Sequence, residues 1–242
     1  MNNIDEICSF YCLNGRVERT KSIKETFNKL DISCNFYEGV NKNDPTIIKL
    51  VEKYHNCIYL MYGHINMIHD FYYNTDKQYG IFCEDDIYIH KNFKKYLQNI
   101  IIDFDILKLD VLLLGYLTCF EIKEEFIDFT LKNNNVRENI NFPYNYHNFP
   151  EHLWGAQMYL LSRKQAKFLL DKYYDGIAYM EQSEKNNNLP PLNPDWTLTK
   201  DGNRALLYPL LVIEKPCQYE DYGQNYLHNY PYLNFYIEED FV

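Results

Sequence analysis

Several loops that mark common enzyme classes are missing from this sequence. It has no Gly-x-x-x-x-Gly-Lys-Ser/Thr loop for nucleotide phosphates, no Gly-x-Gly-x-x-Gly turn for a dinucleotide, and no Gly-x-Ser-x-Gly elbow around a serine nucleophile. P-loop enzymes, the usual dinucleotide oxidoreductases and serine hydrolases are therefore excluded. His64 and His69 are five residues apart on one predicted helix, so they do not share a face as an i, i+4 zinc pair must.

Long apolar runs and paired cysteines are missing as well. No stretch of about 18 consecutive apolar residues occurs, and the first residues carry neither a cationic start nor an apolar stretch, so we expect no membrane span and no export signal. The 7 cysteines include no Cys-x-x-Cys pair, which favours buried thiols in a reducing compartment. We therefore expect a cytoplasmic protein.

Basic residues are in the minority. The chain has 24 lysines and arginines against 34 aspartates and glutamates, which gives a formal net charge of −10. Binding to a phosphate backbone needs a surplus of cations, so we expect no nucleic-acid partner. An anionic ligand would need a local cationic patch or a bound metal.

The order of apolar segments predicts a single α/β domain over residues 1–242. The composition, 46% apolar and 24% charged, is that of a soluble globular chain, and neither a repeat nor a linker divides it. Helical and extended patterns alternate, which is typical of a mostly parallel sheet flanked by helices. We predict strands at 4–13, 35–40, 79–83, 111–114 (ended by Gly115), 158–161, near 206 and at 211–213, and helices at 17–30, 45–54, 65–73, 92–102 and 163–173.

Two polar segments, 132–150 and 181–194, are long for connections in a compact domain. We expect both to be flexible loops, and the first to be either a functional flap or a disordered insert.

An acidic triplet, Glu84, Asp85 and Asp86, follows the predicted strand at 79–83. In a parallel sheet these carboxylates stand at the carboxyl edge, where open α/β sheets bind ligands. In an extended chain Glu84 and Asp86 point to one side and Asp85 to the other, so the outer pair can converge on a hard divalent cation. The alternative is that the triplet caps the next segment or is simply solvated.

Other candidate groups lie at the ends of predicted elements. Arg16 and Arg19 follow the first strand and begin the first helix, where an anion would meet both guanidinium groups and helix amides, although a surface salt bridge with Glu18 explains them as well. Gly155 would let a ligand approach the backbone, or it is an ordinary turn glycine. Asp195 in Pro-Asp-Trp fits a helix N-cap.

Taken in order, these motifs resemble glycosyltransferase family 25. The resemblance extends over roughly residues 5 to 215 and rests on 13–19, His64, Ile-Phe-Cys-Glu-Asp-Asp-Ile at 81–87, Asp-Val-Leu-Leu-Leu-Gly at 110–115, 155–162 with Ala166, Leu169 and Leu170, and Pro-Asp-Trp at 194–196. The family includes lipooligosaccharide and collagen galactosyltransferases and enzymes of giant viruses. The resemblance implies a GT-A type fold, a nucleotide-sugar donor, a diphosphate held by Mn²⁺ (or Mg²⁺), and inversion at the sugar carbon. For a viral member, the location would be the host cytoplasm or the virion.

The resemblance assigns roles to particular residues. A UDP-sugar donor would leave its diphosphate on a metal bound by Glu84, Asp86 and His228, with Arg16 and Arg19 stabilising the leaving group. Asp195 would be the base that takes the proton of a glycan or protein hydroxyl, or else a metal ligand. The remaining substrate-binding candidates are His64, Asp85, Gly155 and Gln157.

Two departures from the family pattern keep other functions open. Gly15 stands in a position where many members have Arg, and Gly63 precedes His64 where Ser is usual. These changes leave a catalytically silent sugar-nucleotide or glycan-binding module as an alternative, and a metal-dependent phosphoesterase as another. The sequence does not identify the donor sugar, the acceptor or the oligomeric state.

Overall fold

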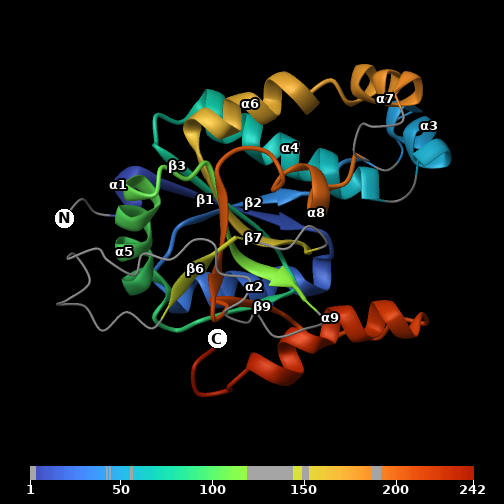
Figure 1. Ribbon diagram of the computed structural model, residues 1–242. Coiled ribbons are helices and arrows are strands. Elements are labelled where there is room, and N and C mark those ends of the chain that lie inside the picture. The colour runs from blue at the N-terminus through green and yellow to red at the C-terminus, as the bar shows by residue number, and fades with distance from the viewer. Residues whose placement is uncertain are drawn as a thin grey trace.

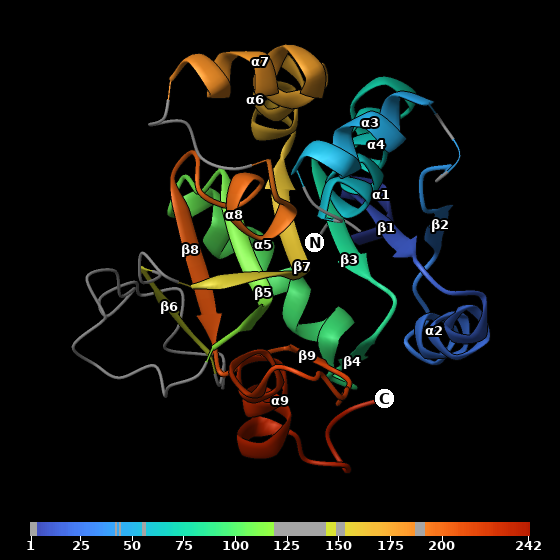
Figure 2. The same ribbon diagram turned by 90° about the vertical axis from the view of Figure 1, so that its right-hand side faces the viewer.

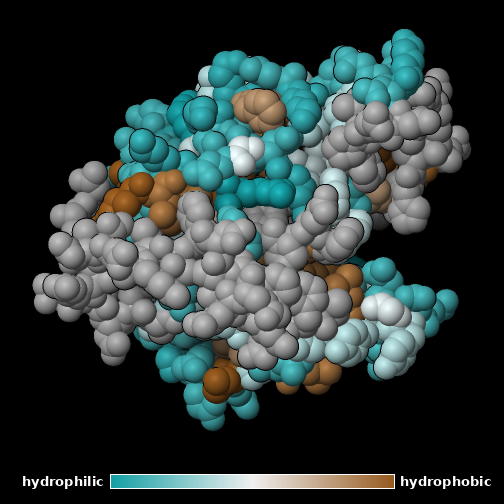
Figure 3. All heavy atoms as spheres, in the orientation of Figure 1, coloured by the Kyte–Doolittle hydropathy of each residue, from teal (hydrophilic) through white to brown (hydrophobic). Residues whose placement is uncertain are grey.

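The computed structural model describes residues 4–41, 43, 45–54, 57–118, 144–148, 153–186 and 192–242. These residues form a seven-stranded sheet with helices on both faces and a second, two-stranded sheet beside it (Figure 1). The space-filling view shows the surface hollowed on its right-hand side, between α9 below and α3 and α7 above (Figure 3).

The main sheet is mostly parallel, as predicted. Its strand order is β2-β1-β3-β7-β5-β8-β6, and the pairing directions show that β7 and β6 run opposite to the other five. The strands are β1 (Cys8–Asn14), β2 (Cys34–Glu38), β3 (Tyr79–Glu84), β5 (Val111–Leu117), β6 (Asn145–His147), β7 (Trp154–Ser162) and β8 (Arg204–Tyr208). The small sheet pairs β4 (Ile87–Ile89) with β9 (Val212–Glu214) in antiparallel fashion.

Helices cover both faces of the main sheet (Figures 1 and 2). One face carries α3 (Pro45–Tyr54), α4 (Cys57–Asn74), α6 (Arg163–Tyr173), α7 (Gly176–Lys185) and the short α8 (Pro194–Thr197). The opposite face carries α1 (Ile4–Ile7), α2 (Val17–Lys29) and α5 (Phe93–Ile106), and α9 (Tyr222–Phe235) packs on β9 and β5. No helix among the described residues is long and apolar enough to cross a membrane.

Burial on both faces explains why the central strands are apolar without interruption. Alternate residues belong to two core clusters, one on each side of the sheet. Tyr11, Phe82 and Tyr159 on three neighbouring strands stack with ring centroids 5.4 Å apart, toward α4. Cys12, which follows Tyr11, and Ile81, which precedes Phe82, belong to the other core cluster and face α2 and α5.

Several predicted bounds are confirmed and others change. α3 has the predicted bounds, and the hydroxyl of Ser162 accepts the amide of Gln165 at the start of α6, as expected of an N-cap. β5 does not end at Gly115. A Cβ there would lie 2.8 Å from Cβ of Val212, so the glycine lets β9 cross closely against the strand.

Other differences concern the ends of the chain and the two polar segments. The first strand is shorter than predicted, because residues 4–7 form α1 and only Cys8 begins β1. Of segment 181–194, residues 181–185 are helical in α7, which is anchored by the buried Tyr179 against Tyr173, and residues 187–191 lie outside the described residues. Of segment 132–150, Asn145–His147 pair with β8, and 132–143, 149 and 150 lie outside the described residues.

Candidate functional site

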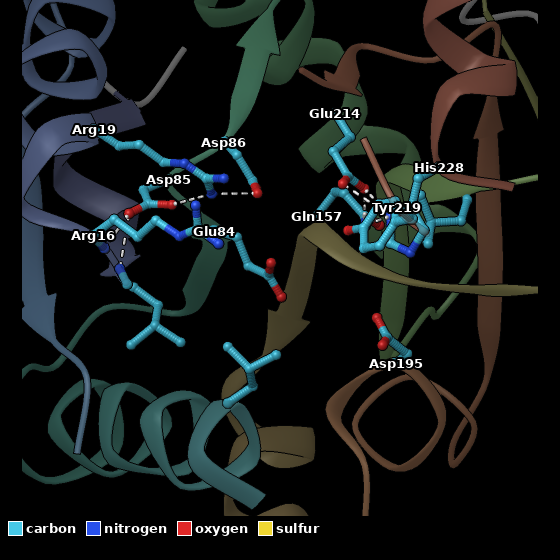
Figure 4. Close-up of a pocket in the computed structure, with 14 residues that line it drawn as sticks. Arg16, Arg19, Glu84, Asp85, Asp86, Gln157, Asp195, Glu214, Tyr219 and His228 are labelled. Atoms are coloured by element: carbon cyan, nitrogen blue, oxygen red, sulfur yellow. Dashed lines mark hydrogen bonds and ion pairs between the residues drawn. The ribbon is translucent and has the colours of Figure 1, made fainter. Parts of the chain in front are cut away.

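A pocket of about 280 Å³ lies at the carboxyl edge of the parallel strands. Figure 4 shows its two walls, one built from the β1–α2 turn and the β3–β4 turn, and the other from β7, α8, β9 and α9. Eight of the ten predicted site residues line it: Arg16, Arg19, Glu84, Asp85, Asp86, Gln157, Asp195 and His228. Glu214 and Tyr219, which the sequence reasoning missed, line it as well.

Asp85 lines the cavity and fixes the turn between β1 and α2. Its Oδ2 accepts the backbone amides of Gly15 at 2.8 Å and Arg16 at 3.1 Å, and its Oδ1 accepts Nη1 of Arg19 at 3.2 Å. The side chain is 4% exposed, so these bonds replace its hydration. Asp85 therefore has a structural task that shapes the cationic wall, in addition to any contact with substrate.

Replacing Asp85 by Asn should destabilise the fold. The asparagine amide has one oxygen, so its NH₂ group would face either the backbone amides of Gly15 and Arg16 or the guanidinium group of Arg19, all of which are donors. A buried donor without an acceptor costs about 2 kcal/mol. In a chain of this size we expect the melting temperature to fall by about 5 °C, measured by scanning calorimetry. Asp31→Asn is the matched control, because that carboxylate is 98% exposed. An unchanged melting temperature for the Asp85 variant would contradict this role.

Asp86 is held by Arg19 and still has an unused oxygen. Nη1 of Arg19 lies 2.5 Å from Oδ2 of Asp86, while Oδ1 of Asp86 is buried and has no hydrogen-bond partner among the described residues. Burial raises the pKa of Asp86, and the charge of Glu214 adds to this effect, which Arg19 partly opposes. A buried acceptor without a donor is the arrangement that a cation would satisfy.

Glu84 lies between the pocket and a buried histidine. Its Oε1 is 3.6 Å from Nε2 of His64. Burial lowers the pKa of His64 to about 3, so the ring is neutral, and its Nδ1 lies 2.9 Å from the hydroxyl of Tyr159. Burial raises the pKa of Glu84 well above its usual range, and Asp86, Asp195 and Glu214 raise it further. His64 does not line the pocket, so the structure places it behind Glu84 and away from the position expected of a substrate contact.

Asp195 faces the pocket from the opposite wall. The N-cap of α8 is Asn193, whose side-chain oxygen accepts the amide of Asp195 at 2.9 Å. The expected N-cap alternative for Asp195 is therefore wrong, and its carboxylate is free of that task. Burial, with the charge of Glu214, raises the pKa of Asp195 to about 6.

Glu214, at the end of β9, connects two other groups of this wall, Gln157 and His228. It is 5% exposed, accepts Nε2 of Gln157 at 3.0 Å, and lies 2.9 Å from Nδ1 of His228. Burial alone would lower the pKa of His228, but the bond to Glu214 and the surrounding carboxylates outweigh burial and raise it. Carboxylate pairing of one ring nitrogen is typical of histidines that bind a metal through the other.

Gly155 has a different role from the one expected. Its φ is +128°, and a Cβ would lie 2.3 Å from Oε1 of Gln157 and 2.7 Å from the backbone nitrogen of Leu117. Protein atoms fill the space that a ligand was expected to use, and Gly155 does not line the pocket. The glycine instead allows the irregular pairing of β7 with β5 and so positions Gln157.

The charge distribution suits a divalent cation. Five carboxylates line the pocket, those of Glu84, Asp85, Asp86, Asp195 and Glu214, and the pKa values of Glu84, Asp86 and Asp195 are raised. Carboxylates that raise one another's pKa repel, and a hard cation such as Mn²⁺ or Mg²⁺ relieves that repulsion. Arg16 and Arg19, on the same wall as Glu84 and Asp86, supply positive charge for an anionic ligand, next to the amino end of α2.

Comparisons with known proteins give one strong match. The family model described as "Glycosyltransferase family 25 (LPS biosynthesis protein)" matches residues 11–183. No curated protein matches the chain.

Among solved structures the similarities are distant. A protein from STIV is 12% identical over 86% of this chain and 84% of that chain, with a TM-score of 0.43. A mannose-1-phosphate geranyltransferase from Thermus thermophilus is 8% identical over 82% and 73%, with a TM-score of 0.42. A glycosyltransferase involved in the glycosylation of the major capsid of PBCV-1 is 12% identical over 75% and 76%, with a TM-score of 0.33.

Proposed function

Because the chain belongs to glycosyltransferase family 25, we propose that it transfers a hexose from a UDP-sugar to a hydroxyl of a glycan or protein, with inversion and with the help of Mn²⁺ or Mg²⁺. The observation that carries this proposal is the pocket in which Asp195 and Glu214 face Arg16 and Arg19 across the carboxyl edge of the sheet, with Glu84 and Asp86 beside the arginines. A nucleotide sugar needs cationic groups for its diphosphate, and next to them hydrogen-bonding groups such as carboxylates for its sugar.

The diphosphate belongs at the Arg16 and Arg19 wall. The turn after β1 leads into the amino end of α2, and the pair Asp85–Arg19 holds this turn in place. The metal candidates are Glu84, Asp86 and His228, whose carboxylate oxygens and imidazole nitrogen suit Mn²⁺. When bound, a divalent cation neutralises the charge that develops on the departing diphosphate. Arg19 and the helix amides stabilise the same charge from the protein side.

Asp195 is the candidate base. It lies on the wall opposite to the arginines (Figure 4), and its pKa of about 6 leaves it ionised at neutral pH yet basic enough to accept a proton. Inversion requires the acceptor hydroxyl to attack from the face opposite to the leaving diphosphate, and a base on the far wall fits this geometry. Gln157, held by Glu214 at 3.0 Å, is placed to contact the donor sugar between the two walls.

Calorimetry with UDP and Mn²⁺, followed by an assay of UDP release from several UDP-hexoses, tests the proposal. We expect metal-dependent UDP binding and slow hydrolysis of at least one donor, because an ordered water can replace the acceptor. Binding without UDP release from any donor would favour the silent binding module. Release of phosphate from simple phosphate esters would favour the phosphoesterase.

A further inference from the structure

A second pocket, of about 660 Å³, opens from the first. The two share Leu117, Asp195, Tyr219 and His228. The described remainder of its lining includes Trp154, Asn193, Gln224 and Leu227. The candidate base therefore stands at the junction of both cavities, and whatever fills the second one reaches Asp195 from the side away from Arg16 and Arg19.

We propose that this second pocket is the acceptor site and that it takes a neutral saccharide, whose apolar ring face stacks on Trp154. The proposal rests on the proposed glycosyl transfer for its place in the reaction, and on the chemistry of the lining for the class of ligand.

Trp154 is presented as a fixed aromatic surface. It remains 37% exposed at the start of β7, and its ring lies 5.4 Å from that of Trp196, centroid to centroid. Lys200 holds the second ring: its Nζ lies 4.4 Å from the centroid of Trp196 and donates to the carbonyl of Leu153 at 2.9 Å. A large aromatic that stays exposed in a concave site, with its back supported, is typical of a binding surface.

The facing side of the pocket is aromatic and polar. The Tyr219 ring packs against His228 with centroids 4.4 Å apart, and its hydroxyl lies 3.3 Å from Nδ1 of His228. Asn193 and Gln224 add amide groups that can both donate and accept. A sugar ring can place its apolar face on the aromatic side chains and hydrogen-bond its hydroxyls to the amides.

Charge argues against a cationic acceptor such as a hydroxylysine side chain. Among the described lining residues, the ionisable carboxylate is Asp195 alone, and the proposed reaction already uses it. An amine placed here would find Trp154, Leu227 and amides around it. A neutral hydroxylated ring meets no such penalty.

Fluorescence can test the ligand class directly, because the chain has 2 tryptophans and both belong to this cluster. Trp196→Phe leaves Trp154 as the sole reporter. With UDP and Mn²⁺ present, we titrate this variant with methyl glucoside, methyl galactoside, methyl mannoside and free 5-hydroxylysine. We expect a saturable change with at least one glycoside and none with hydroxylysine. A response to hydroxylysine alone, or a response to UDP alone that no glycoside alters, would overturn the assignment.

Transfer kinetics separate this proposal from the proposed function. In Trp154→Ala we expect kcat/KM for the accepted methyl glycoside to fall about tenfold or more, as for loss of a buried aromatic anchor, while UDP release without acceptor stays at the wild-type rate. Phe168→Ala is the matched control, because that ring is 43% exposed on α6, away from both pockets. Normal transfer by Trp154→Ala would refute the acceptor site and leave donor chemistry standing. Absence of UDP release from every donor in the wild type would refute the proposed function, and the titration would still decide the pocket's ligand class.

Discussion

Asp86→Asn should lower donor turnover at least about a thousandfold, which corresponds to the loss of several kcal/mol of charge stabilisation by a bound metal. The amide keeps the size of the side chain but removes the charge that both Arg19 and a cation use, and Oδ1 of Asp86 is the buried oxygen without a donor. UDP release measures turnover, and calorimetry with UDP and Mn²⁺ measures binding. We expect metal-dependent binding of UDP to disappear as well.

The fold should survive this change. Asp85 keeps Arg19 and the turn at Gly15 in place without help from Asp86, and removing one carboxylate relieves repulsion with Glu214. Scanning calorimetry should therefore show a melting temperature close to that of the wild type. Asp171→Asn, a surface change on α6, controls for the general effect of losing a carboxylate. Full transfer activity in Asp86→Asn would refute the metal site.

Asp195→Asn should leave donor binding intact and lower transfer at least about a hundredfold, because loss of a general base typically costs that much. In the wild type, a base with a pKa of about 6 is protonated below that pH, so kcat/KM should fall about tenfold per pH unit as the pH drops below about 6. The fall should be absent from the residual activity of the variant. A pH series of initial rates for both proteins provides the measurement.

Binding data decide between the two roles considered for Asp195. A base does not contribute to the affinity for UDP and Mn²⁺, whereas a metal ligand does. Loss of metal-dependent UDP binding in Asp195→Asn would therefore assign the residue to the metal and contradict its role as a base. Asp175→Asn is the control, because that exposed carboxylate accepts the amide of Ala178 near the start of α7 and Asn can accept the same bond.

The wall that carries Arg16, Arg19 and the acidic triplet could be predicted from the sequence because it depends on local patterns. The apolar strand before Glu84 and the helix after Arg16 place both segments at one edge of an α/β sheet. The register confirms this, since Leu13 pairs with Glu84.

The other wall could not be predicted in the same way. Glu214 ends a three-residue strand whose partner is β4, more than a hundred positions earlier, and no spacing pattern connects it with Gln157 or His228. His228 entered the prediction only through the family resemblance. Gly155 was expected to admit a ligand, but it instead lets β7 pack closely on the backbone of Leu117 in the neighbouring strand. A contact between two strands cannot be predicted from the spacing of apolar residues.

The two walls of the pocket also differ in how early each can form during synthesis of the chain. Gly15 and Asp85, 70 positions apart, meet through the neighbouring strands β1 and β3, whereas the far wall needs α9, which follows every other described helix in the chain. Because a polypeptide leaves the ribosome from its amino end, the contact between the β1–α2 turn and Asp85 can form before His228 has been synthesised. A nascent chain interrupted before His228 would lack most of α9, and with it part of the far wall, so the complete cavity forms only after synthesis has passed this residue.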